Sequence, residues 1–221
     1  MLRALIWKEV REIWIIAAVG LAINYWSVIG AMGIPIGLSF SGTLESFPFG
    51  RNDSTIGLIV TASCLCAMTM GWWQNYQEEL RGTRHFLFHR PIDRQSVIAI
   101  KSIVGLTTSI LIALVPTANY ALWAAAPSTH PSPFYWWMAA WSCVYFATIP
   151  LFYLGGFLGG ISRSGFLGTR NLSLLASMLL GAIFGYAMEF RVATILLIGI
   201  TVMAILFIIS IIHVAKTRDI A

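Results

Sequence analysis

The residues best suited to catalysis lie in one charged break of an otherwise apolar chain. Two glutamates open this break, and His85 and His89 follow, four residues apart. Histidines at this spacing share one face of a helix and can bind zinc together, as in His-Glu-x-x-His metalloproteases. That motif needs a glutamate directly after the first histidine, where this chain has Phe86. An intramembrane hydrolase is thus the least favoured alternative, and we expect neither a catalytic residue nor a metal site.

A glycine-rich run has the spacing of a phosphate-binding loop, with Gly155, Gly156, Gly159 and Gly160 in close succession. Such a loop needs a lysine to neutralise the phosphates, and Ile161 stands at that position. We expect no nucleotide site here. Glycines four apart instead remove side chains from one face of a helix, so that a second backbone can approach closely. This packing can join two helices of the chain, which we favour, or two copies of it.

Long uncharged stretches make up most of the chain. About 20 apolar residues cross a bilayer as a helix, and we expect six such spans within residues 13–44, 54–77, 102–126, 134–162, 171–188 and 192–212. A composition of 58% hydrophobic and 10% charged residues cannot fold around one aqueous core without exposing apolar surface. The sequence therefore predicts an all-α membrane protein, with residues 1–221 forming a single transmembrane domain.

Cationic residues set the expected orientation, because cytoplasmic loops retain more lysine and arginine than translocated ones. With both termini cytoplasmic, all of the 14 lysine and arginine residues except Arg51 and Arg191 lie on the cytoplasmic side. A net charge of +5 would suggest nucleic acid for a soluble protein. Here the cations flank apolar spans, so the expected partner is the lipid bilayer and not nucleic acid.

The segment 1–14 has amphipathic helical spacing. Its apolar side comprises Leu2, Ile6, Trp7, Val10, Ile13 and Trp14, and its polar side Lys8, Glu9, Arg11 and Glu12. This pattern predicts an interfacial helix that precedes the first span. The alternative is that the segment forms the charged front end of that span.

The break at 77–96 has apolar residues between its charges, which is typical of a docking element. It resembles the transmembrane subunits of type-2 ABC exporters, the ABC-2 permease family. In that family an acidic residue precedes Gly-Thr, Phe-Leu, a proline turn with a basic residue, and a lysine entering the next span. The matching residues are Glu78 or Glu79, Gly82 and Thr83, Phe86 and Leu87, Pro91 to Arg94, and Lys101. Asp93 departs from the serine common in the family.

The resemblance implies a permease subunit that couples to a separate ABC ATPase, present in two copies. The ATPase would bind ATP and Mg²⁺, and this chain would hold no cofactor. Expected coupling residues are Glu78, Glu79, Arg81, Gly82, Thr83, Arg84, Phe86, Leu87, Arg90, Pro91 and Arg94. The resemblance also implies a second permease copy or a paralogue, the bacterial cytoplasmic (inner) membrane, and export of an amphipathic molecule, peptide, lipid or drug.

An ion-driven carrier or channel is the main alternative function. Such proteins usually need ionisable groups within the membrane, and no Asp, Glu, Lys or Arg lies deep in the uncharged stretches. Asn24 and Asn119 are the most polar residues near the middle of these stretches. We expect both to form hydrogen bonds between helices. Pro116 and Pro150 interrupt helical hydrogen bonding and predict bends in the third and fourth spans.

Overall fold

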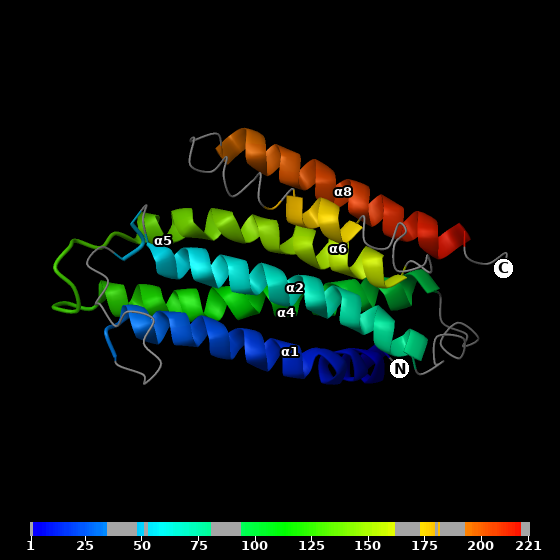
Figure 1. The fold of residues 1–221 in the computed structure, drawn as a ribbon, viewed down its shortest axis with the longest axis horizontal. Coiled ribbons are helices and arrows are strands. Elements are labelled where there is room, and N and C mark those ends of the chain that lie inside the picture. The colour runs from blue at the N-terminus through cyan, green and yellow to red at the C-terminus, as the bar shows by residue number, and fades with distance from the viewer. Residues whose placement is uncertain are drawn as a thin grey trace.

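A computed structural model describes residues 2–34, 48–50, 53–80, 94–161, 173–179, 181 and 193–217. Every element among these residues is helical (Figure 1). The elements are α1 (Leu2–Ala31), α2 (Ser54–Leu80), α4 (Arg94–Ala125), α5 (Trp136–Ser142), the 3-10 helix η1 (Cys143–Thr148), α6 (Ile149–Ile161) and α8 (Ala193–Thr217). Residues 173–179 are also helical. The expected all-α class is confirmed.

Four helical segments of the described chain are long and apolar enough to cross a membrane. They are Arg3–Ala31, Ser54–Glu78, Ser96–Ala125 and Trp136–Ile161, the last of which combines α5, η1 and α6. These lengths and compositions indicate an integral membrane protein. A shorter apolar stretch, Ile198–His213, lies within α8.

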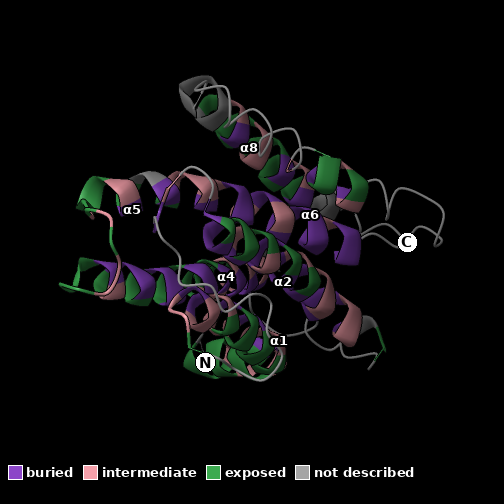
Figure 2. Ribbon diagram, turned by 60° about the vertical axis from the view of Figure 1, so that its left-hand side comes forward, coloured by how far each residue is buried: buried purple, intermediate pink, exposed green. Residues whose placement is uncertain are grey.

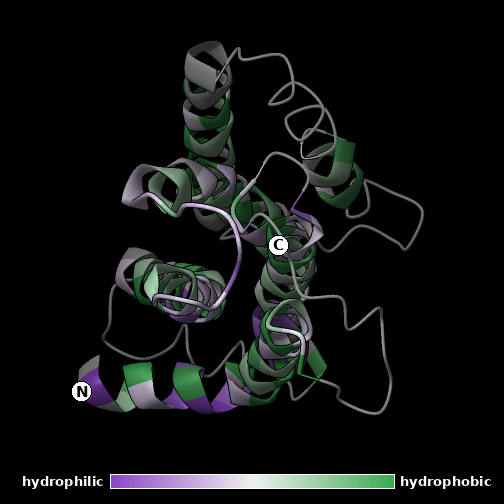
Figure 3. Ribbon diagram, turned by 90° about the vertical axis from the view of Figure 1, so that its left-hand side faces the viewer, coloured by the Kyte–Doolittle hydropathy of each residue, from purple (hydrophilic) through white to green (hydrophobic). Residues whose placement is uncertain are grey.

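The long helices lie roughly along one axis in Figure 1, with α1 and α4 running in one sense along it and α2, α6 and α8 in the other. At one end of the bundle, α1 and α4 begin, and α2, α6 and α8 end (Figure 1). We call this the amino end. The segment 81–93, which joins α2 to α4, therefore connects two helices at the amino end. The first turns of α1 differ from the rest, because they run across the bundle and not along it (Figure 3).

Glycines allow α2 and α6 to pack backbone against backbone. A Cβ atom on Gly156 would collide with the carbonyl oxygen of Met68 on α2. In return, a Cβ atom on Gly71 would collide with the carbonyl oxygen of Tyr153 on α6. Each helix therefore presents a glycine to the other's main chain, and the close approach predicted from the glycine run lies within one chain.

The other glycines of this run are also buried. A Cβ atom on Gly160 would lie 2.8 Å from the carbonyl oxygen of Trp72 on α2. On another side of α6, a Cβ atom on Gly155 would lie 2.6 Å from the Ser177 side chain. Gly159 is buried in the same helix. α6 thus sits between α2 and the helical residues 173–179.

Pro116 leaves a carbonyl without its helical donor, and another helix supplies one. Proline has no backbone N–H, so the carbonyl of Ile112 loses its usual partner four residues on. The side-chain amide of Asn24, on α1, donates to this carbonyl at 2.8 Å and to Ser63 Oγ on α2 at 2.9 Å. Asn24 is fully buried. It joins three helices, as expected of a polar residue in a membrane bundle.

At Pro150 the missing hydrogen bond is compensated within the same helical segment and not by another helix. The 3-10 helix η1 immediately precedes α6, and the backbone N–H of Ile149 donates to the carbonyl of Phe146. An α-helical residue at position 150 would donate its N–H to the Phe146 carbonyl, but proline has no N–H. The 3-10 bond from Ile149 supplies the donor instead. The fourth predicted span therefore contains a change of helix type at its proline, and not one uniform α-helix.

A double-mutant cycle tests the link between Asn24 and Pro116. Asn24→Ala should lower the free energy of unfolding by about 1–3 kcal/mol, because the Ile112 carbonyl stays buried without a donor. In a Pro116→Ala background the helix regains an N–H, so the same change should cost about 1 kcal/mol less. Chemical unfolding of the purified chain in detergent measures both. Equal costs in the two backgrounds would contradict the proposed link.

Candidate functional site

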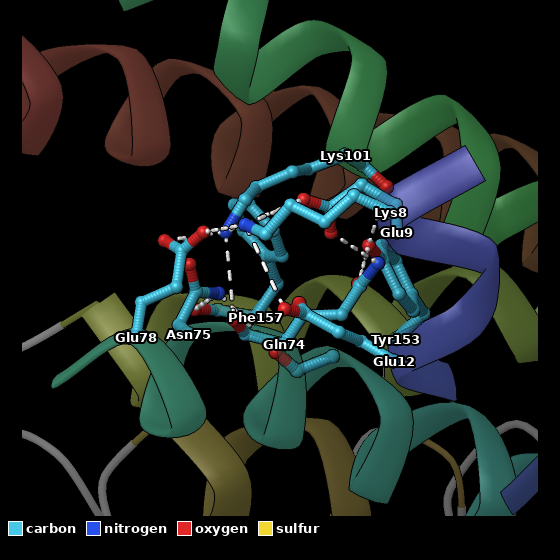
Figure 4. Close-up of polar contacts among 10 residues, drawn as sticks. Lys8, Glu9, Glu12, Gln74, Asn75, Glu78, Lys101, Tyr153 and Phe157 are labelled. Carbon is cyan, nitrogen blue, oxygen red and sulfur yellow. Dashed lines mark hydrogen bonds and ion pairs between the residues drawn. The ribbon is translucent and has the colours of Figure 1, made fainter. Parts of the chain in front are cut away.

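A buried polar cluster at the amino end joins four helices (Figure 4). We call it the amino-end cluster. Its members are Lys8, Glu9 and Glu12 of α1, Gln74 and Glu78 of α2, Lys101 of α4 and Tyr153 of α6. Charged groups are rarely buried in membrane proteins unless they are paired, so their gathering at one place marks a site of structural or functional importance.

Glu78 lies between two lysines. Its Oε1 atom is 2.6 Å from Lys8 Nζ, and its Oε2 atom is 2.6 Å from Lys101 Nζ. The side chains of Glu78 and Lys101 are only 8% and 3% exposed. Short contacts of this kind between ionised groups are strong, and their strength is little reduced by water when both partners are buried. Glu78 therefore ties α1 and α4 to the end of α2.

Glu9 lies deeper and has longer contacts. Its side chain has no exposed surface, and its Oε1 atom lies 3.4 Å from Lys8 Nζ and 4.0 Å from Lys101 Nζ. The amide of Gln74 donates to its Oε2 atom at 3.3 Å. Glu12, one turn further along α1, lies 3.7 Å from Lys8 Nζ. Lys8 is therefore shared by carboxylates of both α1 and α2.

Tyr153 extends the cluster to α6. Its hydroxyl donates to Gln74 Oε1 at 2.7 Å, and the carbonyl oxygen of Lys101 lies 3.1 Å from the same hydroxyl. The ring fills space beside Gly105, where any side chain would collide with it. Close by, the Asn75 amide donates to the Phe157 carbonyl at 3.3 Å. These bonds place α6 in register with α2 and α4.

Residues 1–14 are placed differently from the interfacial helix that their amphipathic pattern predicted. The segment is continuous with α1 and is not a separate helix, although its first turns run across the bundle. Its carboxylates face the bundle, where they meet lysines, and not the aqueous phase. Trp7 and Trp14 face outward, with exposed fractions of 71% and 57%. Arg11 is exposed on the outer side together with these indoles.

The cluster has the composition of an internal ion-pair network. The carboxylates of Glu9, Glu12 and Glu78 offer oxygen atoms within 4.8 Å of one another. Lys8 and Lys101 lie among them and supply positive charge directly. A buried network of this kind holds helices in register, because removing one partner leaves an uncompensated charge.

Most of the predicted coupling residues lie outside the described residues. These are Arg81, Gly82, Thr83, Arg84, Phe86, Leu87, Arg90 and Pro91, and the side chains of Glu79 and Arg94. Glu78 is described, and it differs from the expectation: its carboxylate is buried within the chain and not presented to a partner. The reason is that α2 continues to Leu80, past the uncharged stretch.

Sequence reasoning missed Lys8, Glu9, Gln74 and Tyr153 as members of one site. It assigned charged residues to loops, whereas α1, α2 and α4 all extend beyond their uncharged stretches. The usable signal was the short distance in sequence between these charges and the apolar stretches.

Comparison with known proteins found no match among family models, curated proteins or solved structures.

Proposed function

We propose that this chain is the transmembrane (permease) subunit of an ATP-binding cassette transporter. It crosses the bacterial cytoplasmic membrane six times, with both termini in the cytoplasm. It works with two copies of a separate ATPase, which binds ATP and Mg²⁺, and with a second permease copy or a paralogue. The proposal draws on the resemblance of residues 77–101 to the ABC-2 permease family.

The observation that supports this proposal best is the ion pair between Glu78 and Lys101. Glu78 stands at the end of α2 and Lys101 near the start of α4, so the pair joins the two helix ends that flank the 81–93 segment. The ion pair between Lys8 and Glu78 links the first turns of α1, which run across the bundle, to the same two helix ends. A partner that pushes on the 81–93 segment would therefore move three helices together. Coupling to an external motor needs such a rigid junction.

The arrangement of the helix ends is consistent with the proposed topology. α1 begins and α8 ends at the same end of the bundle (Figure 1), as required when both termini lie in the cytoplasm. α8 has 25 residues, which rise about 37 Å and exceed the ~30 Å of a hydrocarbon core. With the stretch at 171–188 as the fifth span and α8 as the sixth, the chain crosses the membrane six times.

Within this function the residues take distinct roles. Glu78 lies inside the bundle and stabilises the helix ends from which the 81–93 segment extends. Arg81 and Arg84 orient the ATPase through ion pairs at the rim of the interface, and Phe86 and Leu87 form its desolvated anchor. This division replaces the initial expectation that Glu78 itself meets the ATPase.

Glu9 favours a second candidate, an ion-driven carrier. A carboxylate with no exposed surface, held by contacts of 3.3 Å and longer, is the kind of group that binds protons in carriers. Glu9 lies about 10 Å from the start of α1, which places it near one end of the bundle and not at the midplane, where carriers usually bind their ions. The permease therefore remains the preferred function.

Co-purification tests the proposal. The intact chain, extracted in mild detergent, should retain the ABC ATPase encoded nearest to its gene. The double variant Phe86→Ala, Leu87→Ala should weaken the affinity for the ATPase by about 30-fold or more, because buried anchors of an interface each contribute about 2 kcal/mol. The control variant Trp136→Ala, Trp137→Ala removes exposed aromatic residues from the opposite end of the bundle and should retain the ATPase.

Either of two results would count against the permease. If the intact chain binds no ATPase, the assignment to ABC transporters fails, and proton flux through liposomes containing Glu9→Gln becomes the next measurement. If both double variants lose the ATPase equally, the association does not depend on the coupling segment.

A further inference from the structure

Alternating arginines and tryptophans line the outer side of the first turns of α1. Arg3, Trp7, Arg11 and Trp14 are spaced four, four and three residues apart, which places them on one face of a helix. All four are exposed. We call this set the Arg–Trp stripe. α1 lies at the edge of the bundle, with exposed residues on its outer side (Figure 2).

The cations of α1 fall into two groups. Lys8, on the side that faces the bundle, contacts the carboxylates of Glu9, Glu12 and Glu78. Arg3 and Arg11, on the outer side, form no ion pair with any residue that the structure describes. The stripe thus carries two guanidinium groups without a counter-charge from the described part of the chain. Such a surface is complementary to an anion supplied from outside.

The neighbouring indoles indicate where this anion would be. Tryptophan prefers the headgroup level of a bilayer, where its ring is apolar and its N–H can still bond. Trp7 and Trp14 are 71% and 57% exposed, so the bundle leaves most of each residue uncovered. The first turns of α1 run across the bundle at its end (Figure 3). Residues one turn apart on such a segment lie at similar depth, so the guanidinium groups and the indoles share one layer.

We propose that the Arg–Trp stripe binds the headgroup of an anionic phospholipid in the leaflet at the amino end. Arg11 donates two parallel N–H bonds to the phosphodiester, a geometry that guanidinium groups favour. Trp7 and Trp14 flank it on the same face and pack against the glycerol region. Arg3, closer to the end of the helix, adds electrostatic attraction. This inference concerns the lipid alone and does not depend on the ATPase.

Native mass spectrometry of the intact chain in detergent tests this site. The chain is titrated with phosphatidylglycerol or phosphatidylcholine of identical acyl chains, and bound lipids are counted. We expect wild type to prefer phosphatidylglycerol, and Arg11→Gln to weaken this binding about tenfold, as the loss of one charged hydrogen-bonding group predicts. Arg11→Lys should retain part of the affinity, since it keeps the charge but not the forked geometry.

The matched control is Lys216→Gln, which removes one cation from the last turn of α8 and leaves the stripe intact. If this control weakens phosphatidylglycerol binding as much as Arg11→Gln, net charge explains the effect and the site is refuted. Equal retention of the two lipids by wild type refutes it as well. Displacement of the lipid by soluble glycerol phosphate at equal concentration would assign the stripe to a free phosphate compound instead.

A second measurement keeps both arginines and so does not depend on whether the arginine variants fold. Brominated phosphatidylglycerol quenches tryptophans that lie within contact distance of it. Wild type should lose part of its fluorescence at low lipid ratios, and Trp7→Phe should lose a smaller part, because Trp14 remains beside the lipid. Unchanged quenching in Trp7→Phe would overturn the placement of the lipid beside Trp7.

Discussion

Lys101→Met is expected to lower the free energy of unfolding by about 3–5 kcal/mol, the largest effect of any single change in the amino-end cluster. Lys101 is 2% exposed and contacts Glu78 at 2.6 Å and Glu9 at 4.0 Å. Methionine preserves most of the side-chain volume but removes the charge. Glu78 and Glu9 then stay buried, and among the described residues Lys8, which Glu12 also contacts, is the remaining cation beside them.

The measurement is chemical unfolding of the purified chain in lipid-free detergent. Arg11→Gln is the control, because it also removes one cation but at an exposed position, and it should change stability by less than about 0.5 kcal/mol. The double variant Lys101→Met, Glu78→Gln should recover part of the loss, since it removes one of the stranded charges. If Lys101→Met costs no more than Arg11→Gln, the cluster does not hold the helices together.

Gly156→Ala is expected to destabilise the chain by about 3 kcal/mol, at the upper end of the range for overpacked cores. The added methyl group would collide with the main chain of Met68. Backbone atoms have no alternative rotamer, so α2 and α6 must separate to accommodate it. Separation would also disturb the bond between Tyr153 and Gln74, which joins the same two helices.

Gly57→Ala is the matched comparison, because Gly57 lies within α2 and has no atom within 4 Å of an added Cβ. There the same substitution should stabilise the chain by about 0.5–1 kcal/mol, since alanine loses less conformational freedom in a helix than glycine. Opposite signs for the two variants are therefore expected in the same unfolding experiment. A stabilising Gly156→Ala would show that the two backbones are not in close contact.

Much of the architecture could be predicted because it depends on local sequence. The uncharged stretches predicted long apolar helices, and glycines four apart predicted a close helix contact. Asn24 was expected to bond between helices, and it does. The partners could not be predicted, because the Ile112 carbonyl that Asn24 satisfies is 88 residues away and is free only because Pro116 follows it.

The sequence by itself determined the helical class, the apolar character of the long segments and the amphipathic pattern at the start of the chain. These properties follow from the composition and period of neighbouring residues. Only the tertiary structure decided which side of that first segment faces the bundle, and that Lys8, Glu78 and Lys101 form one buried site. A charge near the end of an apolar helix suits either water or a buried counter-charge. The choice depends on residues brought from other helices, and their positions are a property of the whole fold.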